Sequence, residues 1–412
     1  MSRSMSAPDI DVASGGAASA NVISVDAMSG DNGPAPVIGG MAESVWRNPD
    51  LRFIVHGDAA VLTRLLRKRE ELRDRVEIRH TDGVVSMDAK PSKVVRQARG
   101  TSMYSAVESV ANGEASTVVS CGNTGALMAL SMLKLRKAPG VDRPAIAVFW
   151  PSHNPNGYNI VLDVGADVRA DPINMVQYAV MGAEYARVGQ GLDCPRVGIL
   201  NVGSEGNKGG ADMRRAYELI ETEASRPGSV LSFVGFVEGG DILSNRVDVI
   251  VTDGFTGNIA LKTAEGTASF IADALRTSFR HSLMSKLAAL IALPSLRRLK
   301  QKIDPRQVNG GVFLGLNGAV VKSHGGADAT GVAAAIKLAA TMGRTAFPQR
   351  VAEQVAKLTR WQDTAGPVIG AAGASVPPPA GSGPTPQSPD ASGSAPPGTT
   401  ASGTNEPEKS SE

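Results

Sequence analysis

The chain has 412 residues and a formal net charge of +2, so it is long enough to bury a large core and too weakly basic to bind nucleic acid by bulk electrostatics. Aromatic residues are 4% of the chain, which also argues against a stacking surface for single strands. Cys121 and Cys194 have neither metal-ligand spacing nor a disulfide pattern, and no apolar run has the length of a signal peptide or a membrane span. We therefore expect a protein of the reducing cytoplasm with no nucleic-acid partner, no metal and no cofactor.

Strand and helix patterns alternate through the central part of the chain, while both ends are of low complexity. Apolar extended runs predict strands at 21–25, 52–55, 76–78, 145–150, 159–163, 197–202, 232–237 and 247–252. Helical periodicity predicts helices at 61–72, 102–110, 173–188 and 211–225. The alternation predicts an α/β catalytic domain at 21–363, a three-layer α/β/α fold with a mainly parallel sheet. The segments 1–20 and 364–412 are rich in small residues and proline, and we expect both to be disordered.

Three polar loops each follow an apolar strand, at 120–125, 201–209 and 252–258. In parallel α/β sheets, ligands bind beyond the carboxyl ends of the strands. Glycines let backbone N–H groups approach an oxyanion, and asparagine, threonine and lysine add side-chain donors. One such loop is an ordinary turn sequence, but three in the same position predict one shared site for an anionic substrate.

An ordered series of motifs resembles the phosphate acyltransferases of bacterial phospholipid synthesis over about residues 21–350. The stretches that carry the resemblance are 25–31, 120–127, 162–166, 180–182, 201–209, 236–239, 252–258 and 322–325. The resemblance implies an enzyme that converts fatty acyl-(acyl carrier protein) and inorganic phosphate into acyl phosphate. The alternatives are a phosphate acetyl- or butyryltransferase that uses coenzyme A, which has a related fold, and a scaffold without catalytic activity.

The chemistry explains which catalytic residues are expected. Phosphate oxygen attacks the thioester itself, so the site must hold a polyanion and stabilise an oxyanion, without a Ser/His/Asp triad. Lys208, placed among glycines, is the expected cation, although a solvated loop lysine is the alternative. Asp253 is expected to orient Lys208 or to accept a proton from phosphate, and Asn258 to donate to the substrate. Alternatively, Asp253 belongs to a turn that begins a helix containing Asn258.

The loop of Gly122, Asn123, Thr124 and Gly125 precedes an apolar stretch, so its N–H groups are expected at a helix N-terminus, where anions bind. Thr124 is alternatively a plain N-cap. Cys121 is expected to be a small packing residue rather than an acyl-enzyme nucleophile.

Four further residues are assigned to the cleft by the resemblance or by position. The resemblance suggests that Asp26, Gly30 and Asp31 line the cleft, with their carboxylates paired to a cation such as Lys208 or Arg143. His324 ends an apolar strand and either reaches the cleft or forms structural hydrogen bonds.

A basic amphipathic helical pair, the arm, is predicted at about 270–306. Its apolar residues recur every three to four positions, at Leu275, Phe279, Leu283, Leu287, Leu290 and Ile291. Pro294 is predicted to end the first helix, and Leu296, Leu299 and Ile303 begin the second. Seven basic residues and no acidic one lie between 276 and 302, which suits an anionic membrane surface or the acidic acyl carrier protein.

Packing between two subunits is the alternative role of the arm. The resemblance implies homodimers whose arms touch the membrane, a cytoplasmic protein associated peripherally with the membrane, and a glycerol-3-phosphate acyltransferase as a partner.

Overall fold

The computed structural model describes residues 21–206, 208–303 and 310–364. The predictions for 1–20 and for 365–412 lie outside the described residues, as does the last part of the predicted arm. Among the described residues, no helix combines the length and the apolar character that crossing a bilayer requires.

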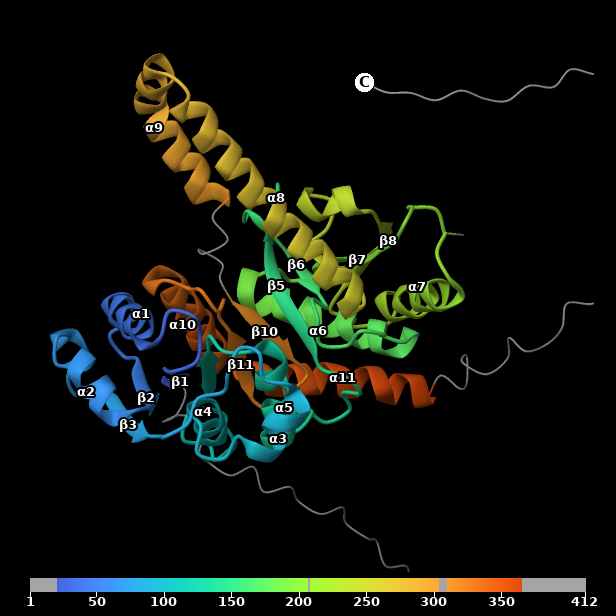
Figure 1. Ribbon diagram of the computed structural model, residues 1–412. Helices are drawn as coiled ribbons and strands as arrows, with labels where there is room; N and C mark the ends of the chain where they lie inside the picture. Colours follow the sequence, from blue (N-terminus) through green and yellow to red (C-terminus); the bar gives the residue numbers. More distant parts are fainter. Residues whose placement is uncertain (1–20, 207, 304–309, 365–412) are drawn as a thin grey trace, which may run out of the picture. The chain divides into compact units, whose positions relative to one another are not determined.

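One 11-stranded sheet runs through the described part of the chain in the order β3-β2-β1-β4-β11-β10-β5-β6-β9-β7-β8 (Figure 1). The strands are β1 (Val22–Asp26), β2 (Arg52–Gly57), β3 (Val76–His80), β4 (Thr117–Ser120), β5 (Ala145–Pro151), β6 (Tyr158–Leu162), β7 (Arg196–Leu200), β8 (Ser232–Val237), β9 (Val249–Val251), β10 (Gly311–Leu314) and β11 (Ala319–Lys322). Most are short, apolar and buried on both faces, as strands of a covered parallel sheet are.

The strand direction reverses in the middle of this sheet. β3, β2, β1, β4 and β11 are parallel to one another, and β6, β9, β7 and β8 form a second parallel set. Between the sets, β10 is antiparallel to β11 and β5, and β5 is antiparallel to β6. The sheet is mainly parallel, as predicted, but β4 and β9 run in opposite senses. The shared site predicted for the three polar loops therefore cannot rest on one common strand direction.

Helices cover both faces, which confirms the three-layer α/β/α fold. On one face, the buried cluster contains residues of α1 (Pro34–Arg47), α2 (Ala59–Leu66), α6 (Pro172–Gln190), α7 (Ala211–Ala224), α10 (Ala329–Arg344) and α11 (Phe347–Thr364). On the other face, the cluster contains residues of α3 (Pro91–Gln97), α4 (Ser102–Ala111), α5 (Thr124–Lys134) and α8 (Gly254–Arg280). Successive residues of β4 alternate between the two faces: Val118 packs in the second cluster and Val119 in the first.

The predicted helical pair is formed by the distal part of α8 and by α9 (Leu283–Ile303), which extend away from the sheet (Figure 1). The predicted break at Pro294 is wrong, because Pro294 lies inside α9. The chain instead breaks just before α9, where Ser282 Oγ accepts a hydrogen bond from Ser285 N at 3.0 Å and begins the new helix. Apolar side chains of the arm are exposed, with Phe270 at 74% and Ile291 at 75%.

Candidate active site

A cleft of about 320 Å³ lies over the middle of the sheet, between the start of α5 and the first turns of α8. Strand β5 supplies apolar lining through Ile146, Val148 and Phe149. The polar lining comes from three separate segments and consists of Thr124, Gly125, Asn258, Lys262, Glu265, Lys322, Ser323 and His324. The cleft therefore offers cations and hydrogen-bond donors beside an apolar surface, a combination that suits a substrate with both an anionic and an apolar part.

Lys322, the last residue of β11, places a largely buried cation in this cleft. Its Nζ donates to the backbone oxygen of Cys121 at 3.5 Å and to that of Ser323. Burial, and more weakly the charge of Lys262, lowers the pKa of Lys322 to about 8, against the opposing effect of Asp31. At neutral pH the ammonium keeps its proton and is available to an anion. The sequence analysis gave Lys322 no role, because burial of a single lysine leaves no pattern in the sequence.

The helix α5 begins at the cleft, as its sequence predicts, and Asn123 rather than Thr124 is the N-cap. Asn123 Oδ1 accepts a hydrogen bond from Ala126 N at 2.9 Å, and its amide donates to the backbone oxygen of Ala89 at 3.3 Å and to that of Met87. Thr124 and Gly125 are exposed at the cleft wall. The first N–H groups of a helix have no partner within the helix, so this end of α5 can bind an anion.

Asp26, Gly30 and Asp31 of the first acidic loop are not among the described residues that line the cleft. Asp26 is buried and accepts a hydrogen bond from Ser120 Oγ at 2.7 Å. The N–H of Asp31 donates to the backbone oxygen of Gly325 at 2.9 Å. Gly30 has a φ of +114°, and a Cβ there would lie 2.9 Å from Cys121 Cβ. Among the described residues, Lys322 is a cation on which the negative charges of Asp31 and Asp26 act.

Cys121 and His324 flank this region and differ in exposure. Cys121 is buried, and burial raises the pKa of its thiol, so the residue is a poor nucleophile and packs as a small side chain. His324 lines the cleft and is exposed, and its Nδ1 accepts a hydrogen bond from Gly326 N at 3.3 Å.

Of the loops that follow β9 and β7, only the one after β9 leads to a residue that lines the cleft among the described residues. Asn258, on α8, lines the cleft opposite Gly165. Asp253 is the N-cap of α8: its Oδ1 accepts hydrogen bonds from the N–H groups of Phe255 at 3.0 Å and Thr256 at 2.9 Å. This is the structural alternative that the sequence left open.

Lys208 is exposed on the loop after β7, where its N–H donates to the backbone oxygen of Glu205 at 3.0 Å. Lys208 and Asp253 are not among the described residues that line the cleft. Because β7 and β9 are parallel neighbours, however, the loop of Lys208 leaves the sheet beside the loop that leads to Asn258.

Two charged residues of α8 were missed by the sequence analysis. Lys262 and Glu265 line the cleft and form an ion pair of 2.7 Å. Lys262 and Glu265 follow Asn258 by four and seven residues, about one and two helical turns, so a helix predicted to begin at Gly254 would have placed them on its face. Among the described residues, no group of three or more His, Cys, Asp or Glu side chains is arranged to hold a metal ion.

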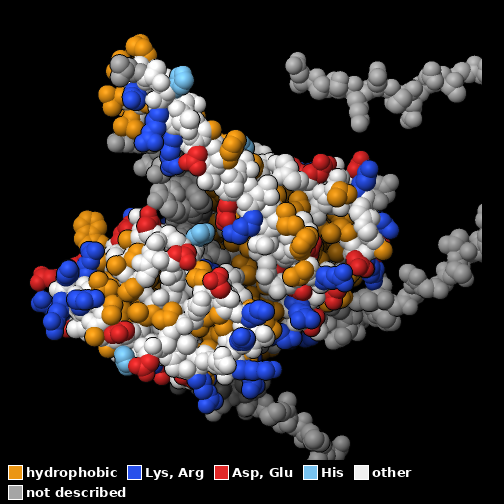
Figure 2. Space-filling model, viewed as in Figure 1, with side chains coloured by type: hydrophobic (Ala, Val, Ile, Leu, Met, Phe, Trp, Pro, Cys, Tyr) orange, Lys and Arg blue, Asp and Glu red, His pale blue; other side chains and the backbone are white. Residues whose placement is uncertain are grey.

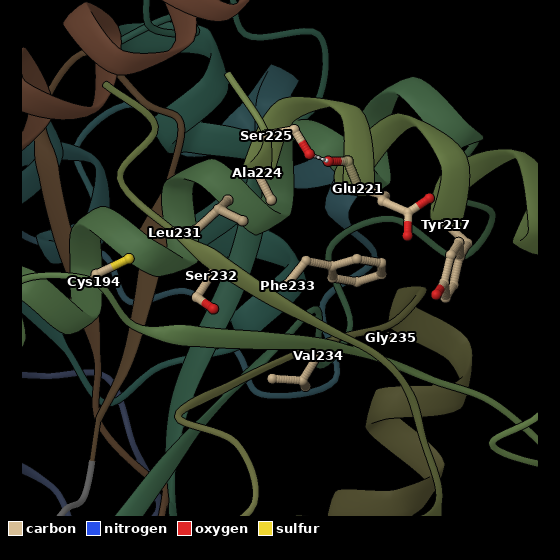
Figure 3. Close-up of a pocket in the computed structure, with 10 residues that line it drawn as sticks. All are labelled: Cys194, Tyr217, Glu221, Ala224, Ser225, Leu231, Ser232, Phe233, Val234 and Gly235. Atoms are coloured by element: carbon tan, nitrogen blue, oxygen red, sulfur yellow. Dashed lines mark hydrogen bonds between the residues drawn. The ribbon is translucent and has the colours of Figure 1, made fainter. Parts of the chain in front are cut away.

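A second hollow, of about 570 Å³, lies at the edge strand β8 and the helix α7 (Figure 3). Its lining includes Tyr217, Glu221 and Phe233, and the two aromatic rings pack edge to face with centroids 4.9 Å apart. None of the predicted site residues belongs to it, and its one charged side chain is a carboxylate, which repels phosphate. The cleft over β5 is therefore the better candidate active site.

Comparisons with known proteins first define the class of fold. The structure resembles a phosphotransacetylase from Streptococcus pyogenes, with a TM-score of 0.53 and 18% identity over 79% of this chain and 93% of the other. It also resembles the EutD phosphotransacetylase from Staphylococcus aureus, with a TM-score of 0.51 and 15% identity over 78% and 94% of the two chains. The chain therefore has the α/β fold of phosphotransacetylases.

Sequence comparison then gives the family. The family model described as "Fatty acid synthesis protein" matches residues 21–350. A relative from Paracoccus denitrificans named phosphate acyltransferase is 62% identical over 336 residues, which cover 82% of this chain and 90% of that protein. A phosphate acyltransferase from Ruegeria is 60% identical over 81% of this chain and 89% of its own length. The chain belongs to this fatty acid synthesis family and is an acyltransferase.

Proposed function

We propose that this acyltransferase converts fatty acyl-(acyl carrier protein) and inorganic phosphate into acyl phosphate for phospholipid synthesis. The observation that carries the proposal is the cleft, in which the partly buried Lys322 and the N-terminus of α5 lie beside the apolar residues of β5. The first two features suit phosphate, and the third suits a fatty acyl chain. The names of the relatives support phosphate as the acyl acceptor.

In the proposed reaction, Lys322 Nζ and the N–H groups of Thr124 and Gly125 hold the phosphate dianion. A phosphate oxygen attacks the thioester carbonyl carbon, the C–S bond breaks, and the proton of the phosphate ends on the departing sulfur. Catalysis then consists of positioning two reactants and stabilising the oxyanion of the tetrahedral intermediate. Asn258 is the proposed side-chain donor to the reacting carbonyl, and His324 is a proposed donor to phosphate.

Lys208 is proposed as a second cation that stabilises the developing oxyanion. The support is its position on the loop next to that of Asn258 and the length of its exposed side chain. Asp253 acts indirectly in this proposal, because its capping of α8 orients the turn that carries Asn258. In the same way, Asp26, Gly30, Asp31, Gly122 and Asn123 support the walls that present Lys322 and α5.

The test measures both sides of the reaction. Purified protein is incubated with long-chain acyl-(acyl carrier protein), with and without phosphate, and the acyl phosphate is trapped with hydroxylamine. We expect thioester loss only when phosphate is present, with one acyl hydroxamate formed for each thioester lost. The rival coenzyme A enzyme is tested by replacing the substrate with acetyl- and butyryl-coenzyme A. Efficient turnover of those short thioesters, or thioester loss without phosphate, contradicts the proposal.

We also propose that the arm contacts anionic membranes, so that the protein associates with them peripherally and passes acyl phosphate to a glycerol-3-phosphate acyltransferase. Figure 2 shows hydrophobic and basic side chains gathered on the arm. Each basic residue near an anionic surface contributes roughly 1 kcal/mol, and buried apolar side chains add a hydrophobic contribution. Among the described side chains of α9, the large exposed apolar residues are Met284, Leu287, Leu290, Ile291 and Leu293.

The membrane proposal predicts that wild-type protein floats with anionic liposomes and that binding weakens, without disappearing, as salt rises. The variant Leu287→Ser/Leu290→Ser/Ile291→Ser should stay in the soluble fraction and keep its activity. Trp46→Ser removes an apolar side chain that is 87% exposed on α1 and serves as the matched control, with unchanged liposome binding. The proposed homodimer is followed by light scattering. If the triple variant becomes monomeric or unfolds, the apolar face packs against a partner subunit instead.

A further inference from the structure

A short basic segment lies beside the mouth of the cleft. Lys90, Lys93, Arg96 and Arg99 recur at every third position on and around α3, and all four are exposed. We call these four residues the basic ridge. Between its two ends the sequence contains no acidic residue, and Val94 and Ala98 are the positions that anchor the segment in the core. The four cations therefore face solvent while the helix that carries them is held against the sheet.

The ridge is attached directly to the wall of the cleft. A Cβ on Gly125, which lines the cleft, would lie 2.9 Å from Pro91 Cγ, so the first turn of α3 is in close contact with the start of α5. The side chain of Asn123 donates to the backbone oxygen of Ala89 at 3.3 Å, one residue before the ridge. Met87 approaches the loop after β11: a Cβ on Gly325 would lie 2.8 Å from Met87 Cε. A partner bound to the ridge would cover this side of the cleft.

The ridge has no internal counter-charge, unlike several other helices that carry exposed arginines. On other helices, exposed arginines pair with nearby carboxylates, as in Arg47 with Glu43, Arg73 with Glu70 and Arg276 with Asp273. Within the part of the chain that the structure describes, no member of the ridge forms an ion pair. Figure 2 shows Lys and Arg side chains gathered at the lower side of this face, over α3. Unpaired like charges repel one another and are stabilised by an acidic partner.

The apolar surface near the ridge favours a protein over a membrane as that partner. Val84, Met87 and Val95 are exposed by 48%, 36% and 40%, so single apolar side chains are interspersed with the charges. Protein interfaces combine modest apolar contacts with charge complementarity in this way. Insertion into a bilayer needs a broader apolar face, which the arm has and α3 lacks.

We propose that the basic ridge is the docking surface for the acidic protein that carries the acyl thioester. This inference rests on the proposed function, which requires the thioester to reach the cleft on a protein carrier. Docking on the ridge brings the carrier's thioester arm to the start of α5, where the proposed phosphate site lies. Charge attraction accelerates encounter and sets the orientation, and it is weakened by salt.

The test reverses the charge of the ridge with Lys90→Glu/Lys93→Glu/Arg96→Glu. Glutamates at positions 90 and 93 lie near the N-terminus of α3, where acids favour the helix, and all three substituted side chains are exposed, so the variant should fold. We expect KM for acyl-(acyl carrier protein) to rise by at least about tenfold, with kcat and KM for phosphate little changed. Binding of the unacylated carrier, measured by fluorescence anisotropy, should weaken by a similar factor. The salt dependence of wild-type binding should be reduced in the variant.

The matched control is Arg64→Glu/Arg67→Glu/Lys68→Glu, which makes the same change of net charge. These exposed residues lie on and just after α2, whose buried residues belong to the cluster on the other face of the sheet. The control should bind the carrier like the wild type. If both variants lose binding equally, net charge alone is responsible and the docking surface is wrong.

Three further outcomes would overturn the inference. A ridge variant with unchanged carrier affinity shows that docking occurs elsewhere. A raised KM for phosphate with normal carrier binding shows that the ridge attracts phosphate instead, and loss of anionic liposome binding alone shows that it contacts lipid. The proposed function is judged separately by the wild-type protein. If that protein makes no acyl phosphate, the function is wrong, whereas carrier binding still tests the ridge.

Discussion

Phosphate affinity should depend on the protonation of Lys322, and pH is the perturbation that isolates this dependence. Burial lowers the pKa of Lys322 to about 8, so the residue is mostly a cation at neutral pH and mostly a neutral amine a unit above that value. Above pH 8, kcat/KM for phosphate should therefore fall about tenfold for each further pH unit. Phosphate itself is already a dianion in this range, so the fall reports the protein. Since kcat/KM reflects the free enzyme, the break should appear near the pKa of the unliganded site.

Two variants separate the charge of Lys322 from its shape. Lys322→Arg keeps a cation that stays protonated throughout the range, so the decline above pH 8 should disappear even if the overall rate is lower. Lys322→Ala should lose about two to three orders of magnitude in kcat/KM for phosphate and show no break at pH 8. The assay is acyl hydroxamate formation at several phosphate concentrations across the pH range. A wild-type profile that stays flat well above pH 8, or the same decline in Lys322→Arg, would refute the reasoning.

Three other predictions address neighbouring parts of the molecule. Lys208→Ala should lower turnover by about two to three orders of magnitude with little change in Tm, and normal turnover of the folded variant would remove Lys208 from the site. Cys121→Ala should keep most activity, whereas a folded but inactive variant would favour a covalent acyl-enzyme. Burial lowers the pKa of His56, which contacts Ser24 and Ser105, from 6.5 to about 4. Between these two pH values the imidazole is protonated in the unfolded state and neutral in the native state. The free energy of unfolding should therefore fall by about 2 kcal/mol as the pH is lowered from 6.5 to about 5 in chemical denaturation, and His56→Gln should reduce this loss.

The layered fold could be predicted because each strand of the parallel sets is a short Val, Ile and Leu run and each helix carries its own periodicity. The reversal of strand direction could not be predicted in the same way. It arises from three antiparallel pairs, β11–β10, β10–β5 and β5–β6. In two of them, β5–β6 and β10–β11, the connections 152–157 and 315–318 are too short for the crossover of ~12 residues that a parallel pair needs. Reading those connection lengths before assigning the sheet would have indicated antiparallel pairs.

The site was predicted where the signal is local and missed where it depends on packing. The loop before α5 was recognised because glycine and asparagine ahead of an apolar helix form a local pattern, although the capping role fell to Asn123 rather than Thr124. Lys322 was quoted only as part of a motif, because its lowered pKa comes from burial in the folded structure and, more weakly, from the charge of Lys262, which is far away in the sequence. The predicted helix break at Pro294 was wrong because it relied on a local signal alone. A strong local breaker was tolerated inside α9, while Ser282 began that helix by capping it.

The helix α8 connects the proposed chemistry to the proposed membrane contact. Its first turn is packed tightly on the loop after β6, since a Cβ on Gly257 would lie 1.9 Å from the backbone oxygen of Asp163. Asp163 in turn is buried and accepts hydrogen bonds from the N–H groups of Gly165 at 3.1 Å and Asp167 at 2.6 Å. The helix α8, 27 residues and roughly 40 Å long in all, carries Asn258 past the cleft and continues into the arm. Because α8 is continuous from the cleft to the arm, we expect a displacement of an arm seated on a membrane to reach the cleft through this helix. An acyl phosphate leaving the cleft along α8 would meet the apolar surface of the arm before it meets bulk water.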